Sequence, residues 1–184
     1  MRIIGGTQRG KRLSSPGNFS IRPTADRVRE SIFNILTGWV SDSRVLDLFA
    51  GTGAMGLEAL SRGAKSAVFI DNHPAALSLI KKNINVCGWT EYAEIIRWDP
   101  TRNLNCIKYQ GELFSLVFID PPYRSGLMPS VLDSLDRSNA LESKALVTVE
   151  HVSTEILDDK ISVFALEDRR LYGKTLVSFF RYMV

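Results

Sequence analysis

The sequence predicts an α/β domain with a parallel, doubly wound sheet. From residue 44 onwards, short continuous apolar runs alternate with segments whose apolar residues repeat at helical spacing. Continuous apolar runs are typical of strands buried on both faces, and repeated strand–helix units form a parallel sheet with right-handed crossovers. Only eight residues separate the last two β-rich segments, 163–166 and 175–182. Because no crossover helix fits there, these two segments predict an antiparallel hairpin.

The chain before residue 44 predicts a small strand pair followed by one helix. Turn-forming residues surround the stretches 2–4 and 11–13, which is typical of a hairpin. A helix is expected from Thr24, as its N-cap, to about Thr37. Its apolar residues repeat at helical spacing; they are Val28, Ile32, Ile35 and Leu36.

The elements after residue 44 follow one another with short connections. Strands are expected at Val45–Phe49, Ala67–Ile70, Ala93–Arg97, Leu116–Ile119 and Leu146–Val149, and in the final hairpin at Val163–Leu166 and Thr175–Tyr182. Helices are expected at Ala54–Arg62, Pro74–Cys87 and Leu127–Leu135. Glycines directly follow the first two of these helices, where a helix readily ends.

The composition excludes several classes of protein. Hydrophobic residues make up 45% and charged residues 23% of the 184 residues, which excludes a disordered chain, a collagen and a coiled coil. No apolar run approaches the roughly 20 residues of a membrane helix, and the first residues lack the apolar core of a signal peptide. Cys87 and Cys106 form no CxxC pair. We therefore expect a cytoplasmic protein without a metal site.

Positive charge is concentrated at the start of the chain. Residues 1–30 carry seven basic and two acidic residues, although the whole chain has a net charge of only +3. We expect an arm over residues 1–23 and a main domain over residues 24–184. The arm is either a solvated tail or a contact surface for a polyanion. The candidate contacts are Arg9, Lys11, Arg12 and Arg22.

A glycine-rich loop follows the first predicted strand of the sheet. Gly51, Gly53 and Gly56 fit the pattern GxGxxG between a strand and a helix, where glycine allows a sharp turn and close approach of a ligand. Asp71 ends the next strand, 20 residues after Gly51, and is expected to bind both ribose hydroxyls of an adenine nucleoside. Asp99, after the third strand, is either an acceptor for the adenine amine or an ordinary turn residue.

Both NAD and S-adenosylmethionine (SAM) contain such a nucleoside, and Asp47 favours SAM. This carboxylate lies within the strand, four residues before Gly51, where it can bind the cationic amino group of methionine. A dinucleotide site would instead leave the loop free for a pyrophosphate. The candidate cofactor-binding residues are Asp47, Phe49, Ala50, Gly51, Thr52, Gly53, Asp71, Asn72 and Asp99.

The fourth predicted strand ends in Asp120-Pro121-Pro122-Tyr123, which we interpret as the catalytic motif. Ligands of open α/β sheets bind at the carboxyl ends of the strands. Because prolines have no N–H, the motif offers only acceptors, which suit the two donors of an NH2 group. Tyr123 offers a flat face for a base. An exocyclic amine held in this way is directed at a methyl sulfonium, and Asp120 is the nearest acceptor for its proton.

Taken together, these motifs resemble the bacterial small-subunit ribosomal RNA guanine-N2 methyltransferases, a family of class I SAM-dependent methyltransferases. The resemblance covers nearly the whole chain. It rests on Arg2–Gly6, Arg9–Leu13, Arg22–Glu30, Ile32–Asn34, Asp47–Gly53, Gly56–Ala64, Asp120–Tyr123, Val149–His151 and Tyr172–Thr175. The glycine loop and Asp-Pro-Pro-Tyr are shared by a wide superfamily, whereas the arm and the Tyr-Gly-Lys-Thr ending are more specific.

The resemblance implies a Rossmann-like sheet of seven strands in the order 3-2-1-4-5-7-6, with strand 7 antiparallel. It also implies SAM as the methyl donor and a guanine flipped out of its RNA into the site. The arm would then contact phosphates of small-subunit ribosomal RNA, either naked or in a partly assembled subunit. A monomer is expected.

Three alternatives remain open from the residues alone. The acceptor motif suits any exocyclic amine, so adenine N6 is a second target. The glycine loop alone is compatible with an NAD-binding oxidoreductase. A non-catalytic RNA-binding assembly factor would use the arm without the catalytic motif.

Overall fold

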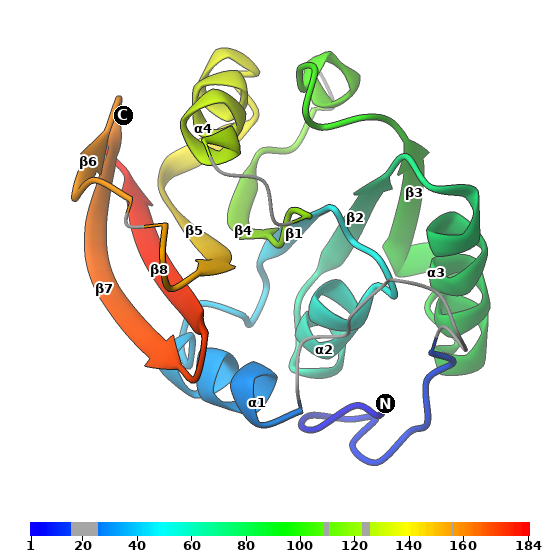
Figure 1. Cartoon of the computed structure of the whole chain (residues 1–184). Coiled ribbons are helices and arrows are strands. Elements are labelled where there is room, and N and C mark those ends of the chain that lie inside the picture. The colour runs from blue at the N-terminus through cyan, green and yellow to red at the C-terminus, as the bar shows by residue number, and fades with distance from the viewer. Residues whose placement is uncertain (16–25, 109–110, 123–125, 156) are drawn as a thin grey trace.

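The computed structural model describes residues 1–15, 26–108, 111–122, 126–155 and 157–184 of the chain. Three residues assigned from the sequence, Arg22, Thr24 and Tyr123, lie outside these ranges. The described part forms one mixed sheet with helices on both faces (Figure 1). The α/β class with a doubly wound sheet, predicted from the alternation of strands and helices, is confirmed.

The sheet contains eight strands in the order β3-β2-β1-β4-β5-β8-β7-β6. The first five strands are parallel, whereas β8 is antiparallel to both β5 and β7. The strands are β1 (Arg44–Leu48), β2 (Ser66–Asp71), β3 (Ala93–Arg97), β4 (Phe114–Ile119), β5 (Leu141–Val152), β6 (Lys160–Ile161), β7 (Phe164–Tyr172) and β8 (Thr175–Tyr182).

The expected order 3-2-1-4-5-7-6 is found, but the expected number of seven strands is wrong. The additional strand is β6, whose two residues pair with Phe164 and Ala165 at the sheet edge. Two residues are too short to produce an apolar run or an alternating pattern, so the sequence carries no signal for this strand. The last two predicted segments form the β7–β8 hairpin, with a turn at Gly173 and Lys174.

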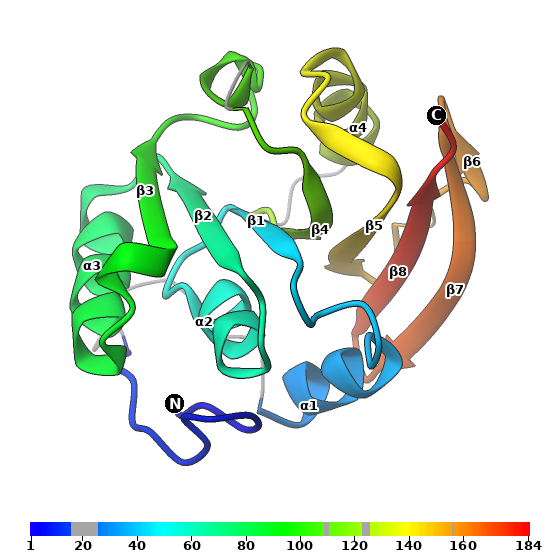
Figure 2. The same ribbon diagram turned by 180° about the vertical axis from the view of Figure 1, so that it is seen from behind.

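The helices divide between the two faces of the sheet because alternate strand residues point to opposite sides. Helices α1 (Asp26–Ile35), α2 (Ala54–Ser61) and α3 (Pro74–Cys87) share one apolar core, whereas α4 (Leu127–Arg137) packs in the other (Figure 2). Two short 3-10 helices, Thr90–Tyr92 and Asn105–Ile107, lie in the connections that flank β3. None of the described helices is long and apolar enough to cross a membrane.

The arm forms an isolated antiparallel bridge where its turn residues predict a small strand pair. Arg2 and Arg12 form an antiparallel bridge, and the amide of Leu13 donates to the carbonyl of Met1. Ile3 and Leu13 are buried in the core that α1, α2 and α3 share. The division between an arm at 1–23 and a domain at 24–184 stays a prediction, because residues 16–25 lie outside the described ranges.

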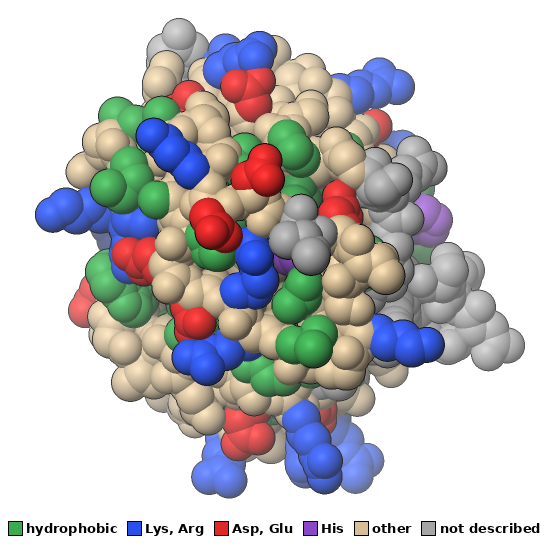
Figure 3. All heavy atoms as spheres, turned by 60° about the vertical axis from the view of Figure 1, so that its left-hand side comes forward, with side chains coloured by type: hydrophobic (Ala, Val, Ile, Leu, Met, Phe, Trp, Pro, Cys, Tyr) green, Lys and Arg blue, Asp and Glu red, His purple; other side chains and the backbone are tan. Residues whose placement is uncertain are grey.

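The other end of the sheet presents charges of both signs (Figure 3). Ion pairs join Arg181 to Glu167, Arg170 to Asp168 and Arg169 to Asp159 on and beside β7 and β8. Charged side chains at a sheet edge discourage pairing with another chain. The mixture of signs contrasts with the arm, where the exposed charges of residues 9–12 are all positive.

Candidate active site

The carboxyl ends of β1, β2 and β4 meet at one edge of the sheet. Leu48 is in register with Ile70 on one side and with Ile119 on the other. Asp71 and Asp120 each follow these partners by one residue, so they flank the end of β1 at a separation of about 10 Å, two strand spacings. The sheet thus brings together two motifs that lie far apart in the sequence.

The glycine loop follows β1 through a series of left-handed residues. Phe49, Gly51 and Gly53 have φ angles of 58°, 56° and 75°. Two hydrogen bonds fix the turn, from the amide of Ala50 to the carbonyl of Ile70 and from the amide of Gly53 to the carbonyl of Ala50. A left-handed φ is strained for any residue with a Cβ atom, so Phe49 adopts this φ at a cost in free energy.

Gly56 is required for a different reason, which is close packing. A Cβ atom there would lie 2.4 Å from the ring of Phe69 and 3.3 Å from Oδ2 of Asp47. Its amide donates to that same Oδ2 at 2.9 Å. Since Gly56 is in the first turn of α2, this bond satisfies one of the amides that a helix start leaves without a partner.

Asp47 is buried and acidic, and its surroundings disfavour its charge. The pKa of this carboxyl is raised to about 8, mainly by burial; the hydrogen bond from Gly56 lowers it and the negative charge of Asp71 raises it, both to a smaller extent. Within the described residues, neither Asp47 nor Asp71 forms an ion pair with a basic side chain. A cationic group brought to this site would therefore favour the ionised form of Asp47.

Asp71 at the end of β2 holds the loop. Its Oδ2 accepts from the amide of Gly51 at 2.9 Å, and its Oδ1 accepts from the amide of His73 at 2.8 Å. A carboxylate has about four acceptor sites, so these two bonds leave capacity for hydroxyl donors. The carboxylate thus joins the glycine loop to the place where the sequence predicts a ribose.

Asn72 and Asp99 lie together beyond the ends of β2 and β3. Asp99 Oδ1 accepts from the hydroxyl of Thr101 at 2.7 Å and from its amide at 3.1 Å. The hydroxyl bond is the largest cause that lowers the pKa of Asp99, and smaller causes include Arg102 and a bond from the Asn72 side chain. The bonds to Thr101 are those of an ordinary turn residue, one of the two roles that the sequence leaves open for Asp99. The other role, a contact with adenine, stays a prediction.

The predicted catalytic motif follows β4 directly. The amide of Asp120 lies 3.5 Å from the carbonyl of Leu48, which ties the start of the motif to β1. Asp120 is partly exposed, Pro121 is buried and Pro122 is exposed. Tyr123 falls outside the described residues, so its role stays a prediction. The described part of the chain contains no group of three His, Cys, Asp or Glu residues that could hold a metal ion.

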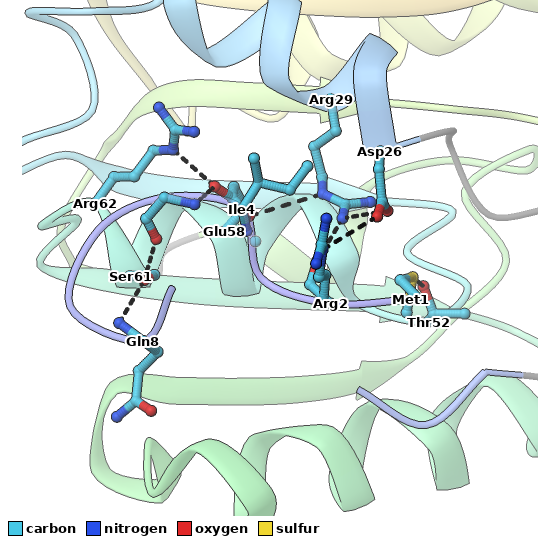
Figure 4. Close-up of polar contacts among 12 residues, drawn as sticks. Met1, Arg2, Ile4, Gln8, Asp26, Arg29, Thr52, Glu58, Ser61 and Arg62 are labelled. Carbon is cyan, nitrogen blue, oxygen red and sulfur yellow. Dashed lines mark hydrogen bonds and ion pairs between the residues drawn. The ribbon is translucent and has the colours of Figure 1, made fainter. Parts of the chain in front are cut away.

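The arm packs against the helix that the glycine loop begins (Figure 4). Glu58 of α2 is fully buried, and its carboxylate accepts from the amides of Ile4 at 2.8 Å and Gly5 at 2.7 Å. It also contacts Arg62 at 2.8 Å and the buried Arg29 at 3.7 Å. The arm is thus held by its backbone, while the side chains of Arg9, Lys11 and Arg12 are exposed.

Sequence reasoning did not find Glu58 or Asn83, a second fully buried polar residue that contacts the arm. A signal for Glu58 exists, because all eight residues of α2 are buried and only Glu58 among them is charged. Asn83 lies beside Ile84 on the apolar stripe of α3. Buried polar side chains need partners, so both positions indicate long-range hydrogen bonds without identifying them.

Comparison with known proteins defines the family. The family model described as "Conserved hypothetical protein 95" matches residues 1–181. The chain belongs to this family. This membership and the similar proteins below confirm the resemblance that the motifs indicate.

Two relatives are named "Ribosomal RNA small subunit methyltransferase D". The one from Escherichia coli K12 is 39% identical over 150 residues, which cover 82% of this chain and 74% of the relative. The one from Haemophilus influenzae is 38% identical over 152 residues, covering 82% and 78%. A solved structure of a hypothetical protein from Thermus thermophilus is 32% identical, with a TM-score of 0.82 over 100% of this chain and 99% of that one.

Proposed function

We propose that this protein transfers a methyl group from SAM to the exocyclic N2 amine of a guanine in small-subunit ribosomal RNA. The observation that carries the proposal is the placement of Asp120 and Pro121 beside the glycine loop, at the shared edge of β1 and β4. The names of the Escherichia coli and Haemophilus influenzae relatives support the RNA substrate. We infer a cytoplasmic enzyme from this substrate.

The residues of the glycine loop fit SAM better than they fit a dinucleotide. The amide of Gly56 at the start of α2 already donates a hydrogen bond to Asp47. A pyrophosphate bound at this helix start would need such amides as free donors. The buried carboxyl of Asp47 suits the methionine ammonium, and Asp71 suits the ribose hydroxyls. The loop of Phe49, Ala50, Gly51, Thr52 and Gly53 would lie along the cofactor, with Asn72 and Asp99 toward its adenine. When bound, SAM supplies an electrophilic methyl group on a sulfonium.

The chain's own residues position the amine and accept its proton. The carboxylate of Asp120 and the carbonyl of Pro121 accept hydrogen bonds from the two N–H groups of the exocyclic amine. These bonds orient the lone pair of the amine nitrogen. Asp120 then takes the proton that the amine loses. Tyr123 is proposed to stack on the base, and Pro122 keeps this turn free of competing donors.

The proposal is tested by methyl transfer from labelled SAM to undermethylated small-subunit RNA, with the modified nucleoside identified. We expect label in N2-methylguanine, and a comparison of naked RNA with partly assembled subunits identifies the preferred substrate. Label in N6-methyladenine would overturn the guanine target. Binding of NAD in place of SAM would support the oxidoreductase.

A variant of the catalytic motif separates an enzyme from an assembly factor. We expect Asp120→Ala to lower the rate of methyl transfer by about 10²–10⁴-fold, because it removes the proton acceptor. Its SAM affinity and folding should match those of the wild type. Asp158→Ala, at an exposed acidic residue, is the control and should retain full activity. Full activity of Asp120→Ala would contradict the proposed mechanism.

A further inference from the structure

One fully buried side chain, that of Asn83 in α3, joins the arm to the glycine loop. Its Oδ1 accepts from the amide of Ser14 at 2.7 Å. Its Nδ2 donates to the carbonyl of Ser14 at 3.1 Å and to the carbonyl of Thr52 at 3.0 Å. Thr52 is the central residue of the Gly51–Gly53 loop. A single amide therefore holds Ser14 of the arm and the middle of the loop in one arrangement.

The first residue of the arm reaches the same threonine. The hydroxyl of Thr52 lies 3.6 Å from the sulfur of Met1, and the two residues lie side by side in Figure 4. Met1 is paired with Leu13 across the hairpin. One side of the hairpin base thus contacts Thr52 directly, and the other reaches it through Asn83. The exposed Arg9 and Lys11 lie toward the opposite end, near the turn.

Glu58 makes the arm and the loop part of the same rigid unit. It lies one helical turn into α2, which begins directly after Gly53. Its two carboxylate oxygens fix the amides of Ile4 and Gly5. Movement of the arm relative to the loop would break these bonds and those of Asn83 together. The arm and the loop are therefore expected to open and close as one unit.

We propose that Asn83 is a positioning residue that couples the two substrates, so that RNA held by the arm strengthens SAM binding and SAM strengthens RNA binding. This inference rests on the proposed function. RNA that holds the arm in its closed position also holds Thr52 through Asn83, so SAM has less opening motion to suppress when it binds. Because binding free energies are linked, the two effects must be equal in size.

The coupling is measured as the ratio of SAM dissociation constants without and with undermethylated small-subunit RNA. For the wild type we expect a ratio of about 5 or more, the lower end of typical coupling. In Asn83→Ala the ratio should fall toward one, with RNA binding in the absence of SAM retained. Asn85→Ala is the matched control, because Asn85 is an exposed amide on the same helix whose side chain contacts Thr90. It should keep the wild-type ratio.

Hydrogen exchange of the wild type tests the same idea without a variant. SAM should slow exchange at the amides of Ile4, Gly5 and Ser14, none of which belongs to the proposed cofactor site. Unchanged exchange there, or equal coupling ratios in the wild type and Asn83→Ala, would overturn the inference. If both substrates bind tightly but without coupling, only the inference about Asn83 is overturned. If neither SAM nor the RNA binds, the proposed function is overturned as well.

Discussion

The glycine loop and the arm are fixed by the same device, a buried carboxylate that accepts from backbone amides, but the charges around the two sites differ. At the loop, Asp47 holds Gly56 and Asp71 holds Gly51. The two carboxylates also repel each other, which contributes to the raised pKa of Asp47. At the arm, Glu58 holds two amides and also contacts two arginines.

This difference distinguishes the proposed ligand site from an anchor. The Asp47 carboxyl is desolvated, has a like charge nearby, and would gain from a cationic ligand. The charge of Glu58 is already compensated inside the protein by Arg29 and Arg62. The residue type and the hydrogen-bonding pattern are alike in both places, so the electrostatic partners must be compared before a buried carboxylate is assigned a function.

The largest effect of a single substitution at a fixed pH is expected where the arm is anchored. Glu58→Ala would leave the amides of Ile4 and Gly5 without their acceptor and Arg29 with Asp26 as a remaining carboxylate partner. Breaking a buried ion pair costs about 3–5 kcal/mol in the free energy of unfolding, and the pair with Asp26 would place the loss toward the lower end of this range. Urea unfolding measures the loss. Glu112→Ala is the control, because Glu112 pairs with Lys65 on the surface and such pairs contribute about 0–1 kcal/mol. Similar losses for the two variants would mean that Glu58 is not an anchor.

The next effect is a pH dependence caused by Asp47. Its pKa is about 8 in the folded protein and 3.8 as the reference value, so the folded state holds the proton more tightly. The free energy of unfolding should therefore fall as pH rises from about 4 to about 8, by at most about 1.4 kcal/mol per pH unit. Asp47→Asn should lose this slope. The measurement is thermal or urea unfolding across that range, in the absence of SAM.

SAM affinity should show the opposite trend, since its ammonium group favours the ionised form of Asp47. Below about pH 8, binding then releases a proton, and affinity rises with pH by at most about tenfold per unit. Calorimetry in buffers of different ionisation enthalpy detects the proton. Asp158→Asn, at an exposed position, should behave as the wild type in both experiments. A stability slope that persists in Asp47→Asn would assign the titration to another group.

The sequence predicts the helices, strands and local motifs of the two regions, but not the long-range contacts of Glu58 and Asn83. The bounds of α3 and β3 agree with those expected, because their apolar residues are regularly spaced and glycine or proline marks the ends of α3. The glycine loop and Asp120 follow from local motifs. In contrast, Glu58 meets its arm partners 53 and 54 residues away, and Asn83 meets Ser14 69 residues away. Such contacts depend on packing, which no local pattern encodes.

The smallest effect is expected from the exposed basic side chains of the arm, and it concerns RNA binding. Replacing Arg9, Lys11 and Arg12 with glutamine should weaken RNA binding and reduce its salt dependence, by about 0.7–0.9 in log–log slope for each phosphate that the arm no longer neutralises. SAM affinity without RNA should not change. Lys81→Gln with Lys82→Gln on the exposed face of α3 is the control and should keep the wild-type slope.

A different result would change the function assigned to the arm. If the arm variant kept the wild-type salt slope, the exposed charges of the arm would not contact phosphates. The arm, held by the buried contacts of Glu58, would then have a purely structural role in packing against α2. A reduced slope with normal stability would instead separate the two functions of one short segment, since its backbone amides bind the protein and its side chains bind RNA.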